Sequence, residues 1–410
     1  MELLLIILVI LVVARLAGEL MERVGQAAIL GELLAGVVLG LLVTSFPNLL
    51  PQFVGIGENE VFRAIFNLGM FFLMFMAGMG MRLEQLAEVS KGGSVIAVGG
   101  LLLPLALGYG LGWLWLPASE YKFAQAFFLG VGLSITSIAI TTKILMDFGQ
   151  LRTKLGSTVV TAAVIDDIIG LGLLAILVSI LEMGRMPSGG ELAILAVKIL
   201  GFFLFAILAG RFIIPRIGAR LHLVKTAEVE FSVALAIALT FAVASAYLGM
   251  HFIIGAFIAG LLIRERTFGQ RVVADIQQRV AGISLGFLAP IFFASIGLYL
   301  DLSALSMALP FTLVLILVAI VGKVIGCGLP ARLFKFSNRE SLAIGSAMNG
   351  RGEVLLITAA VALAAGLFEV PVPTPPIVTA LFSSVVIAAI VTSILTPFGL
   401  KLFLKREPKE

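Results

Sequence analysis

Two adjacent carboxylates, Asp166 and Asp167, lie near the middle of a long run of apolar residues. A carboxylate in a cavity supplies hard oxygen ligands, and it can hold either a small cation or a proton. If the run crosses a bilayer, each charge near its centre costs at least ~2.5–3.5 kcal/mol on insertion scales, so it needs a partner, water or a function. Because adjacent charges are costly as mere scaffolding, the pair indicates a functional site.

Three basic residues also lie well inside predicted membrane spans, away from the span ends: Lys198, Lys323 and Arg351. Asp166 lies twelve residues beyond Lys154, the basic residue at the start of its span. Lys323 lies nine residues before Arg332. At 1.5 Å per residue these depths are roughly 18 and 14 Å, a difference that a lysine side chain can bridge. An Asp166–Lys323 ion pair is therefore geometrically allowed, whereas Asp167, rotated by about 100° around the helix, faces elsewhere.

A purely structural role is the alternative for each of these charges. The two aspartates and Lys323 could form ion pairs that steady a helix bundle. For Lys198 we expect a structural role, aligned with Glu191 seven residues earlier. Glu32 lies near the start of a span, and we interpret it as an interfacial residue.

The composition indicates that membrane helices position these groups. The 410 residues are 60% hydrophobic and only 13% charged, against about 25% charged in soluble domains, so we predict a polytopic membrane protein. The single cysteine, Cys327, cannot form an internal disulfide. We see no basic stripe for nucleic acid and no phosphate-binding loop for a nucleotide, so we expect neither partner and no direct ATP coupling.

A bilayer core takes about 20 helical residues to cross. Hydrophobic runs between charged and turn residues predict thirteen membrane spans, of which the ninth is the shortest. The predicted spans are 1–17, 27–45, 61–80, 93–116, 123–145, 155–182, 190–215, 227–249, 250–264, 280–300, 304–331, 340–366 and 376–403.

Basic residues gather in the odd-numbered loops between these spans. The even-numbered loops and the span ends beside them contain only three basic residues, Arg63, Lys122 and Arg185. By the positive-inside rule, this bias places the N-terminus outside and the C-terminus in the cytoplasm. We therefore expect a multi-pass protein of the inner (plasma) membrane.

Two of the spans are interrupted. Glycine and hydroxyl residues crowd the fifth span between Gly130 and Thr142, and residues 349–353 (Asn-Gly-Arg-Gly-Glu) interrupt the twelfth. Close helix packing is an alternative explanation for the glycines of the fifth span. Broken helices leave carbonyls and helix-end dipoles facing a midplane cavity, where they bind ions or charged substrate. Because the breaks are seven spans apart, the chain predicts two inverted six-helix repeats joined by the seventh span, an architecture of secondary transporters.

The chain resembles, over nearly its whole length, the monovalent cation/proton antiporters, in particular the bacterial NapA-like sodium/proton antiporters. Four motifs carry this resemblance, in order and on the expected spans. They are Thr136–Ile140, Val164–Gly170 with its two aspartates, Gly322-Lys323 and Gly350–Glu353. The fold implied is all-α, with about thirteen transmembrane helices in inverted repeats and two crossed discontinuous helices.

The resemblance implies a role for each candidate residue. Asp167 would be the principal ion- and proton-binding carboxylate, and Asp166 its partner, paired with Lys323. Thr136 and Ser137 would supply further oxygen ligands to sodium at the unwound part of the fifth span. Stabilisation of the second crossing would fall to three residues: Asn349, Arg351 and Glu353.

The resemblance also implies a division of the chain. Dimerisation helices 1–3 and 8–10 would occupy residues 1–92 and 226–303, and they would join two copies in a homodimer. Ion-transport helices 4–6 and 11–13 would occupy residues 93–182 and 304–410, the latter with a short cytoplasmic tail. Residues 183–225 would form the linker helix 7.

We therefore expect a secondary active transporter, not an enzyme, that exchanges sodium or lithium for protons by alternating access without a cofactor. If Asp166 or Lys323 also releases a proton, more than one proton moves per cation and transport is electrogenic. Related potassium-efflux systems usually carry a nucleotide-binding domain, and often glutamine at the position of Asp166, so sodium or lithium is favoured. A potassium/proton antiporter and a sodium-coupled symporter of an organic anion remain the alternatives.

Two further classes are disfavoured. An ion channel would need a repeated filter-like segment, and none is visible. An intramembrane enzyme would need a nucleophile–base set or metal ligands, and the two histidines and single cysteine show no such spacing.

Overall fold

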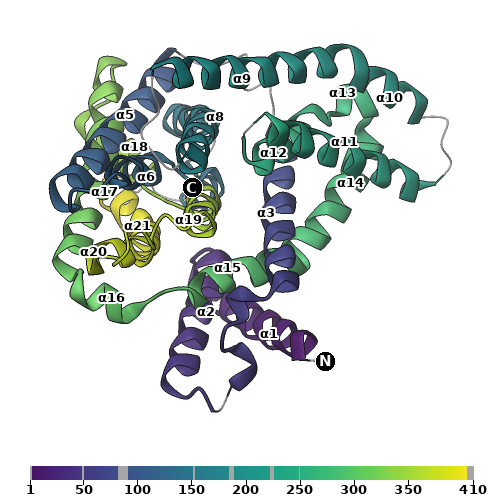
Figure 1. Ribbon diagram of the computed structural model, residues 1–410. Coiled ribbons are helices and arrows are strands. Elements are labelled where there is room, and N and C mark those ends of the chain that lie inside the picture. Colours follow the sequence, from purple (N-terminus) through teal and green to yellow (C-terminus); the bar gives the residue numbers. More distant parts are fainter. Residues whose placement is uncertain are drawn as a thin grey trace. The chain divides into compact units, whose positions relative to one another are not determined.

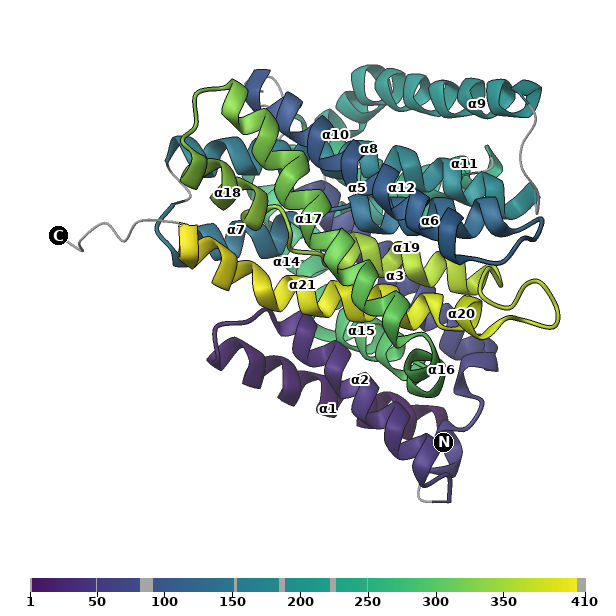
Figure 2. The ribbon, with the colours of Figure 1, turned by 90° about the vertical axis from the view of Figure 1, so that its left-hand side faces the viewer.

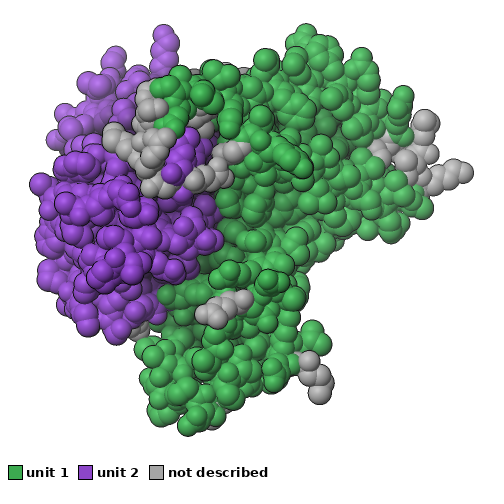
Figure 3. Space-filling view, viewed as in Figure 1, with its two compact units in different colours: residues 1–83, 187–299 green, residues 84–186, 300–410 purple. Residues whose placement is uncertain are grey.

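The computed structural model describes residues 2–48, 50–81, 91–150, 153–183, 189–221, 226–248 and 250–403 (Figure 1). Every regular element within these ranges is a helix. The helices group into two compact units, coloured separately in Figure 3. Unit 1 comprises Met1–Leu83 and Pro187–Tyr299, and unit 2 comprises Glu84–Met186 and Leu300–Glu410.

Unit 1 is built around helix pairs that approach closely. In it, α12 packs on α3 and α11, and α2 packs on α1 and α15. A Cβ at Gly260 of α12 would lie 2.2 Å from the carbonyl oxygen of Phe75 on α3, so the glycine permits this crossing. The longer helices are α1 (Glu2–Arg23), α2 (Ala28–Ser45), α3 (Glu60–Gly80), α9 (Gly189–Leu208), α10 (Ile214–Leu221), α11 (Ala227–Tyr247), α12 (Phe252–Leu262), α14 (Gln270–Ile283) and α15 (Ala289–Leu298). The short ones are η1 (Pro51–Phe53), η2 (Ile56–Glu58) and α13 (Glu265–Phe268), with π-helical turns at η3 (Ala209–Ile213) and η4 (Ser284–Leu288).

Unit 2 places one long helix, α8, among the interrupted ones. This helix packs against α5, α6, α7, α18 and α19, and α17 packs on α5, α18 and α21 (Figure 2). The helices of this unit are α5 (Lys91–Trp115), α6 (Lys122–Ser134), α7 (Ile138–Asp147), α8 (Lys154–Met183), α16 (Leu302–Met307), α17 (Leu309–Leu333), α18 (Asn338–Ala347), α19 (Glu353–Ala364), α20 (Pro376–Thr379) and α21 (Leu381–Phe403).

Both predicted interruptions are confirmed. The fifth predicted span is divided into α6, which ends at Ser134, and α7, which begins at Ile138. The twelfth is divided into α18, which ends at Ala347, and α19, which begins at Glu353. Each break leaves backbone groups without helical partners, and these must be satisfied inside the unit.

Ten helices among the described residues are long and apolar enough to cross a membrane. The other three predicted spans are the two interrupted ones and the ninth, where α12 has 11 residues. The predicted boundary at residue 280 was wrong, because the helix from Gln270 runs through η4 to Leu298. The predicted span begins after Arg279 because charged residues are expected to mark the end of a span. Arg279 and Asp275 pair at 2.8 Å along one helix face, so they continue the helix instead of ending it.

The prediction for Glu32 also fails. Glu32 is not interfacial: only 3% of it is exposed, and its Oε1 lies 3.4 Å from Nη1 of Arg15 on α1. The opposite charge on the neighbouring helix allows the carboxylate to be buried. Lys198 is exposed on α9, and the structural role expected for it stays a prediction.

Candidate ion-binding site

The carboxylate of Asp166 connects three segments of unit 2. On α8, this residue is fully buried, as is Lys323 on α17. The Lys323 Nζ donates to both carboxylate oxygens, at 3.2 Å to Oδ1 and 3.1 Å to Oδ2. The backbone N–H of Thr136, in the break between α6 and α7, donates to Oδ2 at 2.7 Å. The contact expected from the helix depths is therefore present, and the backbone N–H of Thr136 is a second partner of Asp166 that the sequence did not indicate.

The two breaks cross through their backbones. The N–H of Ser137 donates to the carbonyl oxygen of Gly350 at 2.8 Å, and the hydroxyl of Thr136 donates to that of Met348 at 3.1 Å. One turn into α7, the Thr141 hydroxyl donates a hydrogen bond to the carbonyl oxygen of Ala347 at 3.0 Å. The hydroxyl residues of the fifth span thus satisfy carbonyls at the end of α18, which the helix itself leaves open.

Glycine is required in the second break because the first one lies against it. A Cβ on Gly352 would lie 2.6 Å from Oγ and 2.8 Å from Cβ of Ser137. A side chain here would therefore push the two breaks apart. The glycines of residues 349–353 weaken the helix and also admit the opposing segment.

The guanidinium of Arg351 donates hydrogen bonds to several backbone carbonyl groups around the crossing. Its Nη1 donates to the carbonyl oxygen of Asn349 at 3.1 Å and to Oδ1 of that residue at 2.9 Å. Its Nη2 donates to the carbonyl oxygens of Leu133, at 2.9 Å, and Ala319, at 3.1 Å. Leu133 lies in the last turn of α6, and Asn349 lies two residues after the end of α18. The guanidinium therefore opposes the negative ends of two half-helices.

The structure brings most of the predicted site residues together. Asp167 is 5% exposed and follows Asp166 on α8. Thr136 and Ser137 are buried in the first break, and Asn349 and Arg351 are buried in the second. Glu353 begins α19, but its side chain lies outside the described part of the structure. The arrangement combines carboxylates, hydroxyls and open helix ends in a buried position, which suits binding of a small cation in exchange for protons.

Comparisons with known proteins agree with this arrangement. The model of a family described as "Sodium/hydrogen exchanger, transmembrane" matches residues 7–406. The chain belongs to the sodium/hydrogen exchanger family. The family predicted from the motifs is therefore confirmed, and the chain is a multi-pass membrane transporter of monovalent cations and protons.

Individual relatives and a solved structure are also sodium/proton antiporters by name. The chain is 34% identical over 396 residues to the "Na(+)/H(+)-K(+) antiporter GerN" of Bacillus cereus, covering 96% of this chain and 94% of that one. It is 30% identical over 408 residues to a "Na(+)/H(+) antiporter" of Enterococcus hirae, covering 99% of both. The solved sodium proton antiporter MjNhaP1 of Methanocaldococcus jannaschii shares the fold, with a TM-score of 0.72, 20% identity and 99% coverage of each chain.

One positioning residue of this exchanger escaped the sequence reasoning. Ser393 of α21 is buried, and its hydroxyl contacts both backbone polar groups of Arg351. It accepts a hydrogen bond from the Arg351 N–H at 3.0 Å and donates to the Arg351 carbonyl oxygen at 2.6 Å. The hydroxyl thus replaces the helical hydrogen bonds that the break removes. The only available signal was a cluster of hydroxyl residues in the last span, which also fits ordinary helix packing.

We expect Ser393→Ala to loosen the second break. Each backbone group left buried without a partner costs roughly 1–3 kcal/mol, so the thermal unfolding temperature should fall. The apparent affinity for the transported cation should fall as well, because Arg351 would be less firmly held. Ser393→Thr keeps the hydroxyl and should restore both values.

Ser306→Ala provides the matched control, because this exposed serine of the same unit also donates to a helix carbonyl, that of Ser303. An unfolding temperature and cation affinity equal to those of the control would contradict a positioning role for Ser393.

Proposed function

We propose that this exchanger moves sodium or lithium against protons by alternating access, with Asp167 as the shared ion and proton site. The observation that carries the proposal is the pair of adjacent buried aspartates at the crossing of two broken helices. Asp166 accepts hydrogen bonds from Lys323 and from the break. Its neighbour Asp167 lies about 100° further around α8 and faces other surroundings, so the two adjacent carboxylates can take different roles.

Competition at one site explains the exchange. A cation bound by the Asp167 carboxylate, with Thr136 and Ser137 oxygens nearby, must leave before the carboxylate takes up a proton. Hard oxygen ligands suit sodium and lithium ions, which are the transported substrates and not resident cofactors. A core formed by the helices of unit 2 would carry the loaded site between the two faces of the membrane.

The wider assignments follow the same proposal. Unit 1 contains the helices to which we assign dimerisation, and residues 183–225 are assigned to the linker. The N-terminus would lie outside the cell and the C-terminus in the cytoplasm, by the charge bias of the loops. Potassium is the second candidate cation, because the relative GerN of Bacillus cereus is named a Na(+)/H(+)-K(+) antiporter.

Proton flux in proteoliposomes, titrated with sodium, lithium and potassium across pH, tests the proposal. The wild-type protein should respond to sodium or lithium, and Asp167→Ala should reduce the flux to that of protein-free vesicles. Glu369→Gln, which removes an exposed carboxylate from the same unit, should leave the flux unchanged. Robust exchange by folded Asp167→Ala protein would sink the assignment, and sodium-driven solute uptake without proton counterflow would favour a symporter.

We expect transport to respond to membrane potential. If one net positive charge enters per cycle, a potential of 100 mV contributes about 2.3 kcal/mol, which shifts the cation gradient at equilibrium roughly fiftyfold. The check is to clamp the potential of proteoliposomes with a potassium ionophore and measure the final sodium gradient. A gradient independent of the potential would show electroneutral exchange, with one proton per cation.

Lys323→Ala should separate stability from coupling. Removing one partner of a buried ion pair typically costs about 3–5 kcal/mol, because it leaves Asp166 without its cation. We expect a lower unfolding temperature, a shifted pH profile and weaker dependence on membrane potential. The double variant Asp166→Ala/Lys323→Ala should recover part of the stability, while the dependence of transport on membrane potential stays weaker than in the wild-type protein. Unchanged stability, pH profile and potential dependence in Lys323→Ala would remove Lys323 from the mechanism.

A further inference from the structure

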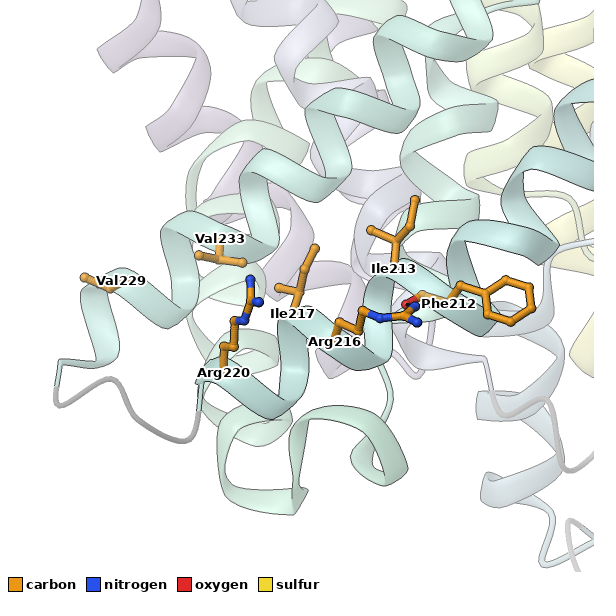
Figure 4. A pocket seen from close by; sticks show the side chains of 7 residues that line it. All are labelled: Phe212, Ile213, Arg216, Ile217, Arg220, Val229 and Val233. Atoms are coloured by element: carbon orange, nitrogen blue, oxygen red, sulfur yellow. Dashed lines mark hydrogen bonds between the residues drawn. The ribbon is translucent and has the colours of Figure 1, made fainter.

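Unit 1 contains an open groove that the exchange reaction does not use (Figure 4). It lies between the end of the α9–α10 helix and the first turns of α11, and its volume is about 450 Å³. Five apolar side chains line it: Phe212, Ile213, Ile217, Val229 and Val233. The two other lining residues are Arg216 and Arg220, so the groove is apolar with a basic wall.

The two arginines are neighbours on one helix. They are four residues apart on α10, and both are exposed. Arg216 donates through Nη1 to the carbonyl oxygen of Phe212. Neither arginine forms an ion pair with a carboxylate in the part of the chain that the structure describes. Glu228, which precedes the groove residue Val229, lies 3.7 Å from Arg279 instead.

The groove is placed where a membrane helix leaves the bilayer. The apolar segment Val197–Arg220 is long enough to span, and both arginines lie in its last turns. Along α9 towards the groove, Leu200, Leu204 and Leu208 recur every four residues and are 68%, 57% and 46% exposed. An exposed apolar path therefore leads to two guanidinium groups. Guanidinium groups bind phosphate through paired, charge-assisted hydrogen bonds.

We propose that this groove binds an anionic phospholipid. Its phosphate would lie between Arg216 and Arg220, and its acyl chains would extend past Phe212 along the exposed leucines of α9. A free phosphate would leave the apolar lining in water, and an uncharged apolar ligand would leave both arginines without a counter-charge. Only a ligand that is anionic at one end and apolar at the other matches both parts of the lining.

Native mass spectrometry of the whole protein in mild detergent tests the proposal. The protein is titrated with palmitoyl-oleoyl phosphatidylglycerol and, separately, with the zwitterionic phosphatidylcholine of the same chains. We expect one phosphatidylglycerol per chain to bind more tightly than phosphatidylcholine. In Arg216→Gln/Arg220→Gln, roughly thirtyfold more phosphatidylglycerol should be needed, because each basic residue near a lipid surface contributes a factor of five or so.

The control variant is Arg266→Gln/Arg271→Gln, which removes the same charge from exposed positions of unit 1 outside the groove. It should retain wild-type affinity, and Arg216→Lys/Arg220→Lys should give an intermediate value because lysine keeps the charge without the planar fork. Unfolding temperatures measured in phosphatidylcholine identify any variant that fails to fold, and the lysine variant keeps the comparison informative in that case.

Four outcomes would overturn the proposal. Equal losses in the groove and control variants would mean general attraction of anionic lipid to a basic surface. Equal binding of the two lipids would remove the role of net charge. Displacement of phosphatidylglycerol by millimolar inorganic phosphate alone would indicate a free-anion site. A change of oligomeric state in Arg216→Gln/Arg220→Gln without loss of lipid would make the groove a contact between two copies of the chain.

Discussion

A helix that breaks inside a membrane leaves backbone groups that neither water nor lipid can satisfy, and unit 2 depends on how the protein meets this constraint. The two breaks satisfy each other: the Ser137 N–H donates to Gly350, and the Thr136 hydroxyl donates to Met348. Side chains from unbroken helices complete the set, since Asp166 accepts from Thr136 and Ser393 contacts both polar groups of Arg351. The crossing is therefore a continuous hydrogen-bonded cluster and not a gap between helices.

The charges of the cluster follow the polarity of the half-helices. Arg351 lies where α6 and α18 end, and it donates to carbonyl oxygens at both ends. The Asp166 carboxylate instead accepts from the backbone N–H of Thr136, just before α7 begins. Each buried charge thus faces helix ends of opposite sign, which reduces the cost of burying it. Lys323 completes the compensation of Asp166, which lowers the cost of burying this carboxylate in an apolar unit.

The sequence predicted those parts of the site that depend on fixed local geometry. The rise of an α-helix placed Asp166 and Lys323 at similar depths. Glycine with hydroxyl residues located the break in the fifth span, and glycine with charge located the break in the twelfth. Partners supplied by backbone could not be predicted, because the carbonyl groups of Leu133 and Ala319 exist whatever the side chains are. Glu32 was misread for a related reason. Its burial depends on the register between α1 and α2, which no local pattern determines.

The same cluster constrains how a site at Asp167 could change its access. In the part of the chain that the structure describes, the hydrogen-bond partners of Asp166 and Arg351 all belong to unit 2 and lie on α6, α17, α21 or in the two breaks. Sliding any one of these segments past the others would leave a buried charge or backbone group without its partner. Each unsatisfied backbone group costs about 1–3 kcal/mol, and an unsatisfied charge costs more. Moving all of them together breaks none of these bonds. Under the proposed exchange, rigid movement of the whole cluster is therefore less costly than a local gate beside the aspartates, and the binding geometry is preserved on both faces of the membrane.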